Sequence, residues 1–317
     1  MSRSAVDRRI RSLRPPKPAV DPHRAHGSVL ETERRPDGRL ERALTIFLAG
    51  AECPFTCCFC DLWRWTVDGR TAVGALPTQL EAVLLEADRS ASHAERLKLY
   101  NASNFFDPRA VPVADRPRLA ELAAPFAGVT VESHASTIGP ATLEFARRLP
   151  GRLEVGMGLE TIHPVAAAHL NKRLDLHAFE RAAGYLTDHD IDVRVFVLLG
   201  APYVPADASV EWTLRAVEHA ARCGASVVSI IPVRGGNGEM ERLAQLGAFT
   251  PPTLSQLETS LDHCLLVPGC VVTADLWNVE ELPACDDCRA MRVARLYRIN
   301  VHGRPEPRHI CPVCDAL

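Results

Sequence analysis

Cys53-Pro54-Phe55-Thr56-Cys57-Cys58-Phe59-Cys60 is a cysteine-rich stretch that follows an apolar run, residues 43–49. The run has the length and the β-branched content of a buried strand. Cys53, Cys57 and Cys60 have three and then two residues between them, which suits a loop folded around three corners of an iron–sulfur cube. Such a cube normally takes four thiolates, and Cys58 cannot easily be the fourth because adjacent side chains in a loop rarely reach the same cluster. We therefore expect one iron to stay open for a group other than protein; a zinc or structural cysteine cluster is the alternative.

The composition is that of a globular protein with one large domain and appendages, or with two domains. The chain has 317 residues, of which 47% are hydrophobic, and its net charge of −3 predicts no general affinity for polyanions. We find no apolar stretch long enough for a membrane span and no apolar segment typical of a secretory signal. The 11 cysteines fall into spaced groups that indicate metal ligation in a reducing compartment. We expect a cytoplasmic protein.

The two ends of the chain are basic and its centre is acidic. Residues 1–43 carry 11 Arg and Lys against 6 Asp and Glu. Residues 1–42 are also rich in proline and show no sustained apolar period, so we expect a basic N-terminal arm, extended around the domain or partly disordered. The arginines of the arm either contact phosphates or are simply solvated: Arg8, Arg9, Arg11 and Arg14.

From residue 43 onward, strand and helix signals alternate. Strands are predicted at residues 43–49, 97–100, 129–131, 153–157, 193–199 and 226–233. Helices, with apolar residues three and four apart, are predicted at residues 78–87, 116–124, 141–149, 177–187 and 210–223.

Six such βα repeats predict a parallel sheet with helices outside it. The repeat count fits either a partial barrel or a doubly wound sheet. In both architectures the site lies at the carboxyl ends of the strands, and the cysteine loop comes directly after the first of them.

The C-x3-C-x2-C motif, with Phe59 before its last cysteine and a strand before its first, resembles the signature of the radical S-adenosylmethionine (SAM) superfamily. The resemblance implies an α/β fold, a partial (βα)6 TIM-like barrel over residues 43–270. It also implies a 4Fe-4S cluster on Cys53, Cys57 and Cys60 whose open iron binds SAM, with Phe59 beside the cofactor. An electron donor such as flavodoxin or ferredoxin would be needed for the reductive cleavage of SAM.

Polar residues follow the second and third predicted strands. Asn101 and Ser103 stand where the superfamily often has a Gly-Gly-Glu-like segment that meets the SAM amino group, although this chain lacks both the glycines and the acid. Their polar groups could equally satisfy a loop. Glu132 could accept hydrogen bonds from a ribose diol or an ammonium group, or it could form a structural ion pair with Arg194.

The fourth predicted strand ends in glycines and an acid. Gly156 and Gly158 would let a flat adenine approach the backbone, and Glu160 would offer a fixed acceptor, similar to the Gly-rich, acid-ending segment near adenine in the superfamily. The alternative is that the glycines only allow tight packing. The fifth strand, which contains Leu198, resembles the strand that stacks on adenine through its backbone.

Residues 153–179, which include Asn171-Lys172-Arg173, resemble the branch of MiaB-type methylthiotransferases, the elongator catalytic subunit and archaeosine synthase. The nearest likeness is to archaeosine synthase and its uncharacterised bacterial relatives, and it covers residues 43–265. This implies a chemistry of nucleoside or tRNA modification without fixing the substrate.

The C-terminal residues 271–317 predict a small four-cysteine metal-binding module, similar to a zinc ribbon. Two C-x2-C pairs, Cys285 with Cys288 and Cys311 with Cys314, would complete a four-thiolate site for zinc or for an auxiliary iron–sulfur cluster. The segment between the pairs either binds a nucleic-acid backbone or only forms a metal staple that caps the barrel. Its basic and aromatic residues are Arg292, Arg295, Tyr297, Arg298 and Arg304.

Three functional hypotheses follow, and none of them singles out a catalytic residue. The first is a radical SAM enzyme that abstracts a hydrogen from a nucleoside, with tRNA or a modified nucleoside as substrate. The second is a radical SAM enzyme that acts on a small metabolite or a peptide. The third is a non-catalytic iron–sulfur or zinc protein that binds nucleic acid or senses redox state.

Overall fold

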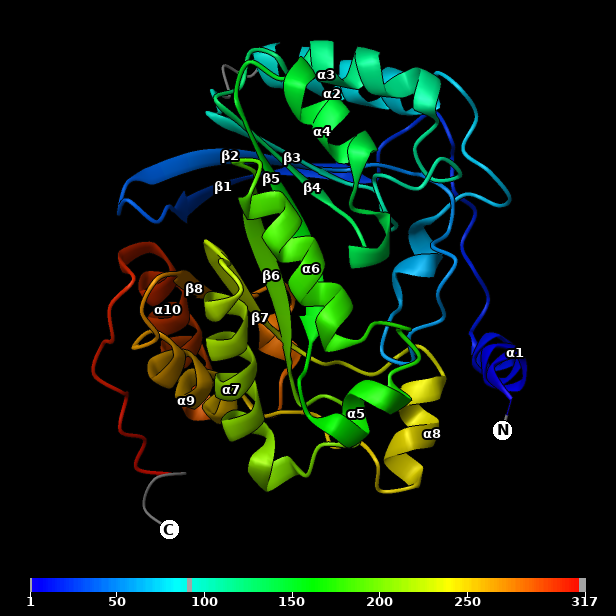
Figure 1. Cartoon of the computed structure of the whole chain (residues 1–317). Helices are drawn as coiled ribbons and strands as arrows, with labels where there is room; N and C mark the ends of the chain where they lie inside the picture. The colour runs from blue at the N-terminus through cyan, green and yellow to red at the C-terminus, as the bar shows by residue number, and fades with distance from the viewer. Residues whose placement is uncertain (1, 90–92, 314–317) are drawn as a thin grey trace.

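The computed structural model describes residues 2–89 and 93–313, which form one curled sheet with helices around it (Figure 1). The strands follow one another in chain order from β1 to β8; β1 pairs antiparallel with β2, and every later pair is parallel. The strands are β1 (Gly27–Arg34), β2 (Leu40–Phe47), β3 (Arg96–Tyr100), β4 (Gly128–Glu132), β5 (Arg152–Glu160), β6 (Asp192–Leu199), β7 (Val227–Pro232) and β8 (Val271–Ala274).

Ten α-helices lie in the described residues, most of them on the outside of the sheet (Figure 1). They are α1 (Arg3–Leu13), α2 (Ala75–Arg89), α3 (Arg116–Ala123), α4 (Pro140–Arg148), α5 (Pro164–His169), α6 (Leu176–Thr187), α7 (Ser209–Arg222), α8 (Glu239–Gln245), α9 (Leu254–Cys264) and α10 (Asp286–His302). None of these helices is long and apolar enough to cross a membrane.

The predicted partial α/β barrel is confirmed. All six predicted strands are present as β2 to β7, and all five predicted helices as α2, α3, α4, α6 and α7. A doubly wound sheet would reverse its strand order from a central first strand, whereas here the order runs in one direction. The sheet is also strongly curled. The curl brings β6 near β1 across the inner side of the sheet, where Arg194 pairs with Glu33 at an N–O distance of 2.8 Å.

The prediction of an extended or disordered arm over residues 1–42 is wrong for two segments. Residues 3–13 form α1 and residues 27–34 form β1, the outer strand of the sheet. Ile10 anchors α1 in an apolar cluster, where it is only 4% exposed. Two arginines of the arm are engaged in ion pairs, Arg9 with Glu239 and Arg14 with Glu52.

Helix α10 covers the gap between the two ends of the sheet. It contacts both β1 and β8, two strands that do not pair with each other in the described chain. The amide of Asn300 on α10 accepts from the backbone N–H of Ala274 at 2.9 Å and donates to its carbonyl at 2.8 Å. The helix thus covers the edge of β8 and satisfies the backbone groups of Ala274, which would otherwise be unpaired there.

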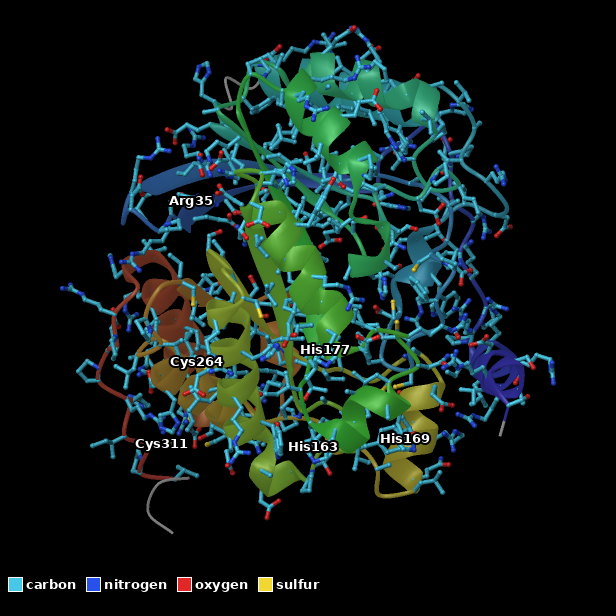
Figure 2. The ribbon with its side chains drawn as sticks, viewed as in Figure 1. Arg35, His163, His169, His177, Cys264 and Cys311 are labelled. Atoms are coloured by element: carbon cyan, nitrogen blue, oxygen red, sulfur yellow. The ribbon has the colours of Figure 1, made fainter. Side chains whose placement is uncertain are left out.

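A buried ion network fills the inner side of the sheet near the amino ends of the strands. The carboxylate of Glu154 accepts from Arg194 at 2.7 Å, from Arg35 at 2.9 Å and from Thr130 at 3.0 Å. Burial alone would raise the pKa of Glu154, but the neighbouring arginines hold it well below its usual range. Arg35, labelled in Figure 2, therefore connects the β1–β2 turn to β5.

Replacement of Arg194 by Ala should destabilise the fold by about 3–5 kcal/mol, because it leaves the buried carboxylate of Glu154 without its closest cation. Urea denaturation at neutral pH measures the effect. The matched control is Arg148→Ala, whose exposed pair with Glu144 on α4 should matter by no more than about 0.5 kcal/mol. Equal losses in the two variants would contradict a central role for the network.

Candidate cluster site at the carboxyl end of the sheet

The cysteine loop follows β2 at the carboxyl end of the parallel strands, and its three spaced cysteines are half-buried. The N–H of Cys60 donates to the carbonyl of Cys57 at 3.1 Å, which folds the loop back on itself. Burial raises the pKa of all three thiols, that of Cys60 to about 12, and the thiols of Cys53 and Cys60 each raise the pKa of Cys57 further. The three sulfurs thus share one environment, in which bound cations would be needed to ionise them.

Cys58 lies on the other side of the loop. Its side chain is 1% exposed and packs in an apolar cluster with Ile10, Leu170 and Leu198. Its N–H donates to the carbonyl of Leu170 at 3.0 Å. Cys58 therefore anchors the loop to the protein and does not share the environment of the other three cysteines.

A lysine that sequence reasoning missed, Lys172, lies beside the three thiols with its side chain only 15% exposed. Burial alone would lower the pKa of Lys172, but the Glu160 carboxylate and the thiols of Cys57 and Cys53 raise it overall. The ammonium donates to Glu160 at 2.6 Å. The only sequence signal was the run Asn171-Lys172-Arg173, and a lysine on a polar loop gives no sign that it will be buried.

The backbone at Gly158 and Glu160 accommodates this ion pair. The register between β5 and β6 shifts between these two residues, and Glu160 adopts a left-handed backbone with φ of 67°. Such a bulge re-aims a side chain at the end of a strand. A Cβ at Gly158 would lie 2.5 Å from the Lys172 nitrogen and still closer to Glu160, so this glycine makes room for the pair.

The loop after β3 carries polar atoms that no protein group satisfies. Both polar atoms of the Asn101 amide and the hydroxyl of Ser103 are buried and have no hydrogen-bond partner among the described residues. Ala102 between them has a left-handed φ of 53°. Asn104, which the sequence analysis did not select, donates from its amide to the Cys53 sulfur at 3.5 Å and accepts from the His134 N–H at 2.8 Å. This loop therefore offers unused donors and an acceptor beside the cysteines.

Glu132 does not form the ion pair that the sequence allowed. Arg194 pairs with Glu33 and Glu154 instead, and the Glu132 carboxylate has no hydrogen bond or ion pair within the described residues. Burial raises its pKa to about 7, against the opposing charges of Lys98, Lys172 and Arg194. On the neighbouring strand, a Cβ at Gly156 would lie 3.5 Å from the Glu132 side chain and 2.9 Å from Phe196.

Two further predicted cofactor residues pack beneath the loop. Phe59 is half-buried against the apolar cluster that contains Cys58, and Leu198 is a buried member of the same cluster. The carbonyl of Leu198 accepts from the Thr213 hydroxyl at 3.1 Å. Phe59 and Leu198 therefore help to anchor the cysteine loop to this apolar cluster.

A second group of cysteines lies near the C-terminus. The sulfurs of Cys285, Cys288 and Cys311 all lie within 4.8 Å of one another, and Figure 2 places Cys311 beside α9 and α10. The sulfurs of Cys285 and Cys311 are 3.9 Å apart. Tetrahedral coordination with metal–sulfur bonds of about 2.3 Å puts ligands about 3.8 Å apart, so this spacing suits one shared ion. The fourth predicted ligand, Cys314, lies outside the described residues.

The segment between the two C-x2-C pairs is the helix α10 and not a β ribbon, and two of its arginines are internal. Arg292 and Arg295 are 7% and 2% exposed. Arg292 pairs with Glu258 at 2.8 Å and donates to the Cys288 sulfur at 3.1 Å, and Arg295 pairs with Glu258 and Asp262. These two arginines are therefore unavailable to nucleic acid, whereas Tyr297, Arg298 and Arg304 are exposed.

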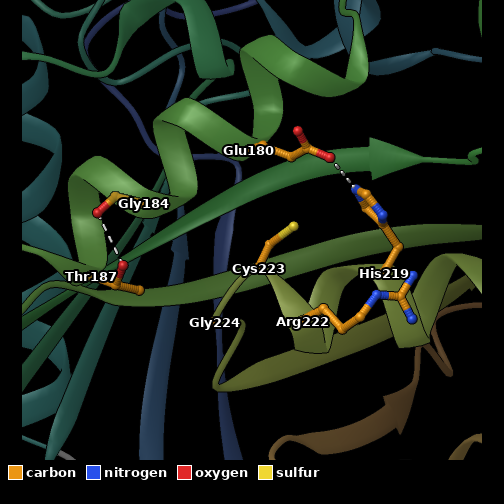
Figure 3. Close-up of a pocket in the computed structure, with 7 residues that line it drawn as sticks. All are labelled: Glu180, Gly184, Thr187, His219, Arg222, Cys223 and Gly224. Carbon is orange, nitrogen blue, oxygen red and sulfur yellow. Dashed lines mark hydrogen bonds and ion pairs between the residues drawn. The ribbon is translucent and has the colours of Figure 1, made fainter.

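A pocket of about 550 Å³ lies between α6 and α7 (Figure 3). It is near the amino ends of β6 and β7, because Thr187 precedes β6 and Gly224 precedes β7. Burial raises the pKa of the Cys223 thiol in its wall, which disfavours the thiolate. The pocket is at the opposite end of the sheet from the cysteine loop and contributes nothing to that site.

Glu132→Gln should stabilise the protein at about pH 8 by about 3 kcal/mol, and at about pH 5 by less than about 1 kcal/mol. The carboxyl of Glu132 titrates at about 7 in the folded state and at 4.5 when unperturbed, so wild-type stability falls as pH rises between these values. The glutamine does not titrate. Urea denaturation across this pH range measures the difference, with Glu144→Gln on an exposed carboxylate as the control. A gap between variant and wild type that is independent of pH would contradict the raised pKa.

No protein-family model matches the sequence, and no curated protein matches it. The fold, in contrast, is similar to solved structures. The archaeal Methanocaldococcus infernus Elp3 with an N-terminal deletion superposes with a TM-score of 0.54 at 11% identity, over 70% of this chain and 59% of that one. Methylornithine synthase (PylB) gives 0.54 at 14% identity, over 82% of this chain and 69% of that one.

A radical SAM methyltransferase from Sphaerobacter thermophilus gives a TM-score of 0.52 at 15% identity, over 78% of this chain and 73% of that one. The chain thus spans less than two thirds of the Elp3 structure and somewhat more of the other two. These similarities concern the arrangement of the sheet and its helices. The chain therefore shares its fold with these three solved structures, one of which is a radical SAM methyltransferase.

Proposed function

We propose that the protein is a radical SAM enzyme that holds a 4Fe-4S cluster on Cys53, Cys57 and Cys60. The observation that carries the proposal is the gathering of these three thiols at the carboxyl end of the sheet, with the fourth cysteine of the loop turned into the core. They are more widely spaced than the C-terminal cysteines, as expected when each thiolate binds a different iron. A reductant such as flavodoxin or ferredoxin would supply the electron.

The residues around the loop fit SAM at the open iron. The cation of Lys172 can offset the negative charge of a carboxylate, and the unpartnered amide of Asn101 and hydroxyl of Ser103 can bind polar groups. When bound, the cluster and SAM supply one-electron cleavage of a carbon–sulfur bond and abstraction of a hydrogen atom. The protein would orient SAM and keep water and stray hydrogen donors away.

A nucleoside, free or in tRNA, is the proposed substrate. Phe47 lies between Tyr100 and Trp277, with ring centroids 6.4 and 5.7 Å away, and Trp277 is 57% exposed. Such aromatic surfaces stack on bases. Glu132, unpartnered at the end of β4, can accept from N–H groups of a base or from a ribose.

A small metabolite or a peptide is the second candidate. The burial of Arg292 and Arg295 favours it, because it removes half of the basic residues that made α10 a candidate RNA surface. The contacts of α10 with β1 and β8 then give the C-terminal module a capping role. In both cases we propose a cytoplasmic location, because the spaced groups of cysteines are typical of metal ligation in a reducing compartment.

Replacement of Cys53, Cys57 or Cys60 by Ala should abolish cluster binding and the formation of 5′-deoxyadenosine from SAM under anaerobic, dithionite-reduced conditions. Each thiolate is expected to bind a different iron, so the loss of one should release the cluster. The matched control is Cys58→Ala, which removes a cysteine of the same loop that faces the core. A wild-type protein that binds iron and sulfide but never yields 5′-deoxyadenosine would favour a non-catalytic redox or nucleic-acid-binding protein.

For the C-terminal module, we propose that one zinc ion is bound by Cys285, Cys288 and Cys311, with Cys314 as the fourth ligand. Cys311→Ser should then lower the zinc content by about one ion per chain and leave iron and sulfide unchanged. Elemental analysis of anaerobically purified protein measures both. Loss of iron and sulfide in this variant would instead identify an auxiliary iron–sulfur cluster.

A further inference from the structure

The N-terminal helix α1 is docked on the back of the cysteine loop. The carboxylate of Asp7 accepts from the Thr56 hydroxyl at 2.6 Å and from the Asn171 amide at 2.9 Å, and it forms an ion pair with Arg173. Thr56 directly precedes Cys57 in the chain. One side chain of α1 is therefore bonded to two segments that are more than 100 residues apart in the sequence.

The second of these segments holds Lys172, the partly buried lysine of the site. Asn171 and Arg173 flank Lys172, and both have left-handed backbones, with φ of 55° and 60°. The Asn171 amide also donates to the Thr56 carbonyl at 2.9 Å, which ties the two segments directly. Non-glycine residues in this conformation persist only where their surroundings hold them. The bonds to Asp7 supply such a hold on both sides of Lys172.

Apolar and ionic contacts seat the helix in one position. Ile10 packs in the cluster that contains Cys58 and Met240 of α8. Arg9 pairs with Glu239 at the start of α8 at 2.9 Å. The backbone of Leu13 passes so close to Gly238 that a Cβ there would overlap its carbonyl oxygen. The helix is thus fixed between the cysteine loop and α8, and Asp7 is held against its three partners.

Helix α1 is expected to be unstable in isolation. It has 11 residues, with Ile10 as its only buried one and no side-chain cap at its start. Isolated helices of this length are marginal in water. Its folding is therefore coupled to the presence of the cysteine loop and the Lys172 segment in their folded positions, and the converse coupling must hold as well.

We propose that Asp7 is a positioning residue that fixes the cysteine loop and the Lys172 segment relative to each other. Its role for the cluster rests on the function proposed above, whereas its hold on the two segments is a property of the protein without cofactor. Charge-assisted hydrogen bonds of this kind order loops, and a site that is loose by a fraction of an ångström loses much of its activity.

Amide hydrogen exchange on cofactor-free Asp7→Ala tests the hold directly. We expect exchange at residues 56–60 and 170–173 to rise roughly 10-fold or more, with the central strands β3 to β6 unchanged. The control Arg8→Ala changes an exposed neighbour on the same helix and should leave both segments as in wild type. Asp7→Glu keeps the charge and should restore part of the protection.

Unchanged exchange at both segments in Asp7→Ala would overturn the proposal. A rise spread over the whole sheet would also overturn it, because Asp7 would then only stabilise the fold. If Asp7→Ala does not fold, Arg173→Met provides the test, because it removes one partner of Asp7 and leaves the sequence of the helix intact. This variant should raise amide exchange at residues 170–173 and at Thr56. Protection of these residues at the wild-type level would contradict the proposal.

A second readout concerns the cluster. In reconstituted Asp7→Ala, the electron paramagnetic resonance signal of the reduced cluster should change less on addition of SAM than in wild type, and Asp7→Glu should recover part of the change. A wild-type protein without a cluster would defeat the proposed function and leave the exchange experiment valid. A normal spectroscopic response in Asp7→Ala, together with faster exchange, would contradict the positioning of Lys172 at the site.

Discussion

The buried carboxylate of Glu154 is the point on which the inner side of the sheet depends. It binds Arg194 of β6, Arg35 after β1 and Thr130 of β4, so strands from both halves of the sheet meet at one anion. Charges this deep are tolerated only when every partner is in place. The network fills the space near the amino ends of the strands, and the chemistry-bearing side chains are left at the carboxyl ends, where Glu132 has no partner in the described chain.

The two groups of cysteines differ in geometry. Cys285 and Cys311 approach to 3.9 Å, as two ligands of a single ion do. The cysteines of the loop after β2 lie around a backbone turn between Cys57 and Cys60, and the side chain of Cys58 points from this loop into an apolar cluster. In a chain with 11 cysteines, local backbone geometry thus sets the sulfur spacing within each group.

The parts of the fold that the sequence predicts are those with strong local signals. Apolar runs in β2 to β7 and the amphipathic outer helices were recognisable, and so was the cysteine spacing. The strand β1 was not, because Val29 and Leu30 are its only large apolar residues and it lies at the edge of the sheet. The helix α1 has one buried residue, Ile10. Arg295 is buried through a pair with Glu258, and Lys172 is partly buried through a pair with Glu160; both partners lie on other elements of the chain, and no local pattern announces such pairs.

The coverage of β8 by α10 has a consequence for synthesis on the ribosome. The backbone of Ala274, at the edge of β8, is bonded by Asn300, which leaves the exit tunnel well after the strand itself. Until that residue emerges, the nascent chain presents an unpaired strand edge, the kind of surface through which polypeptides associate. The edge of β8 is therefore covered by a helix that is translated after it, and a message cut short before α10 would yield a product inclined to aggregate.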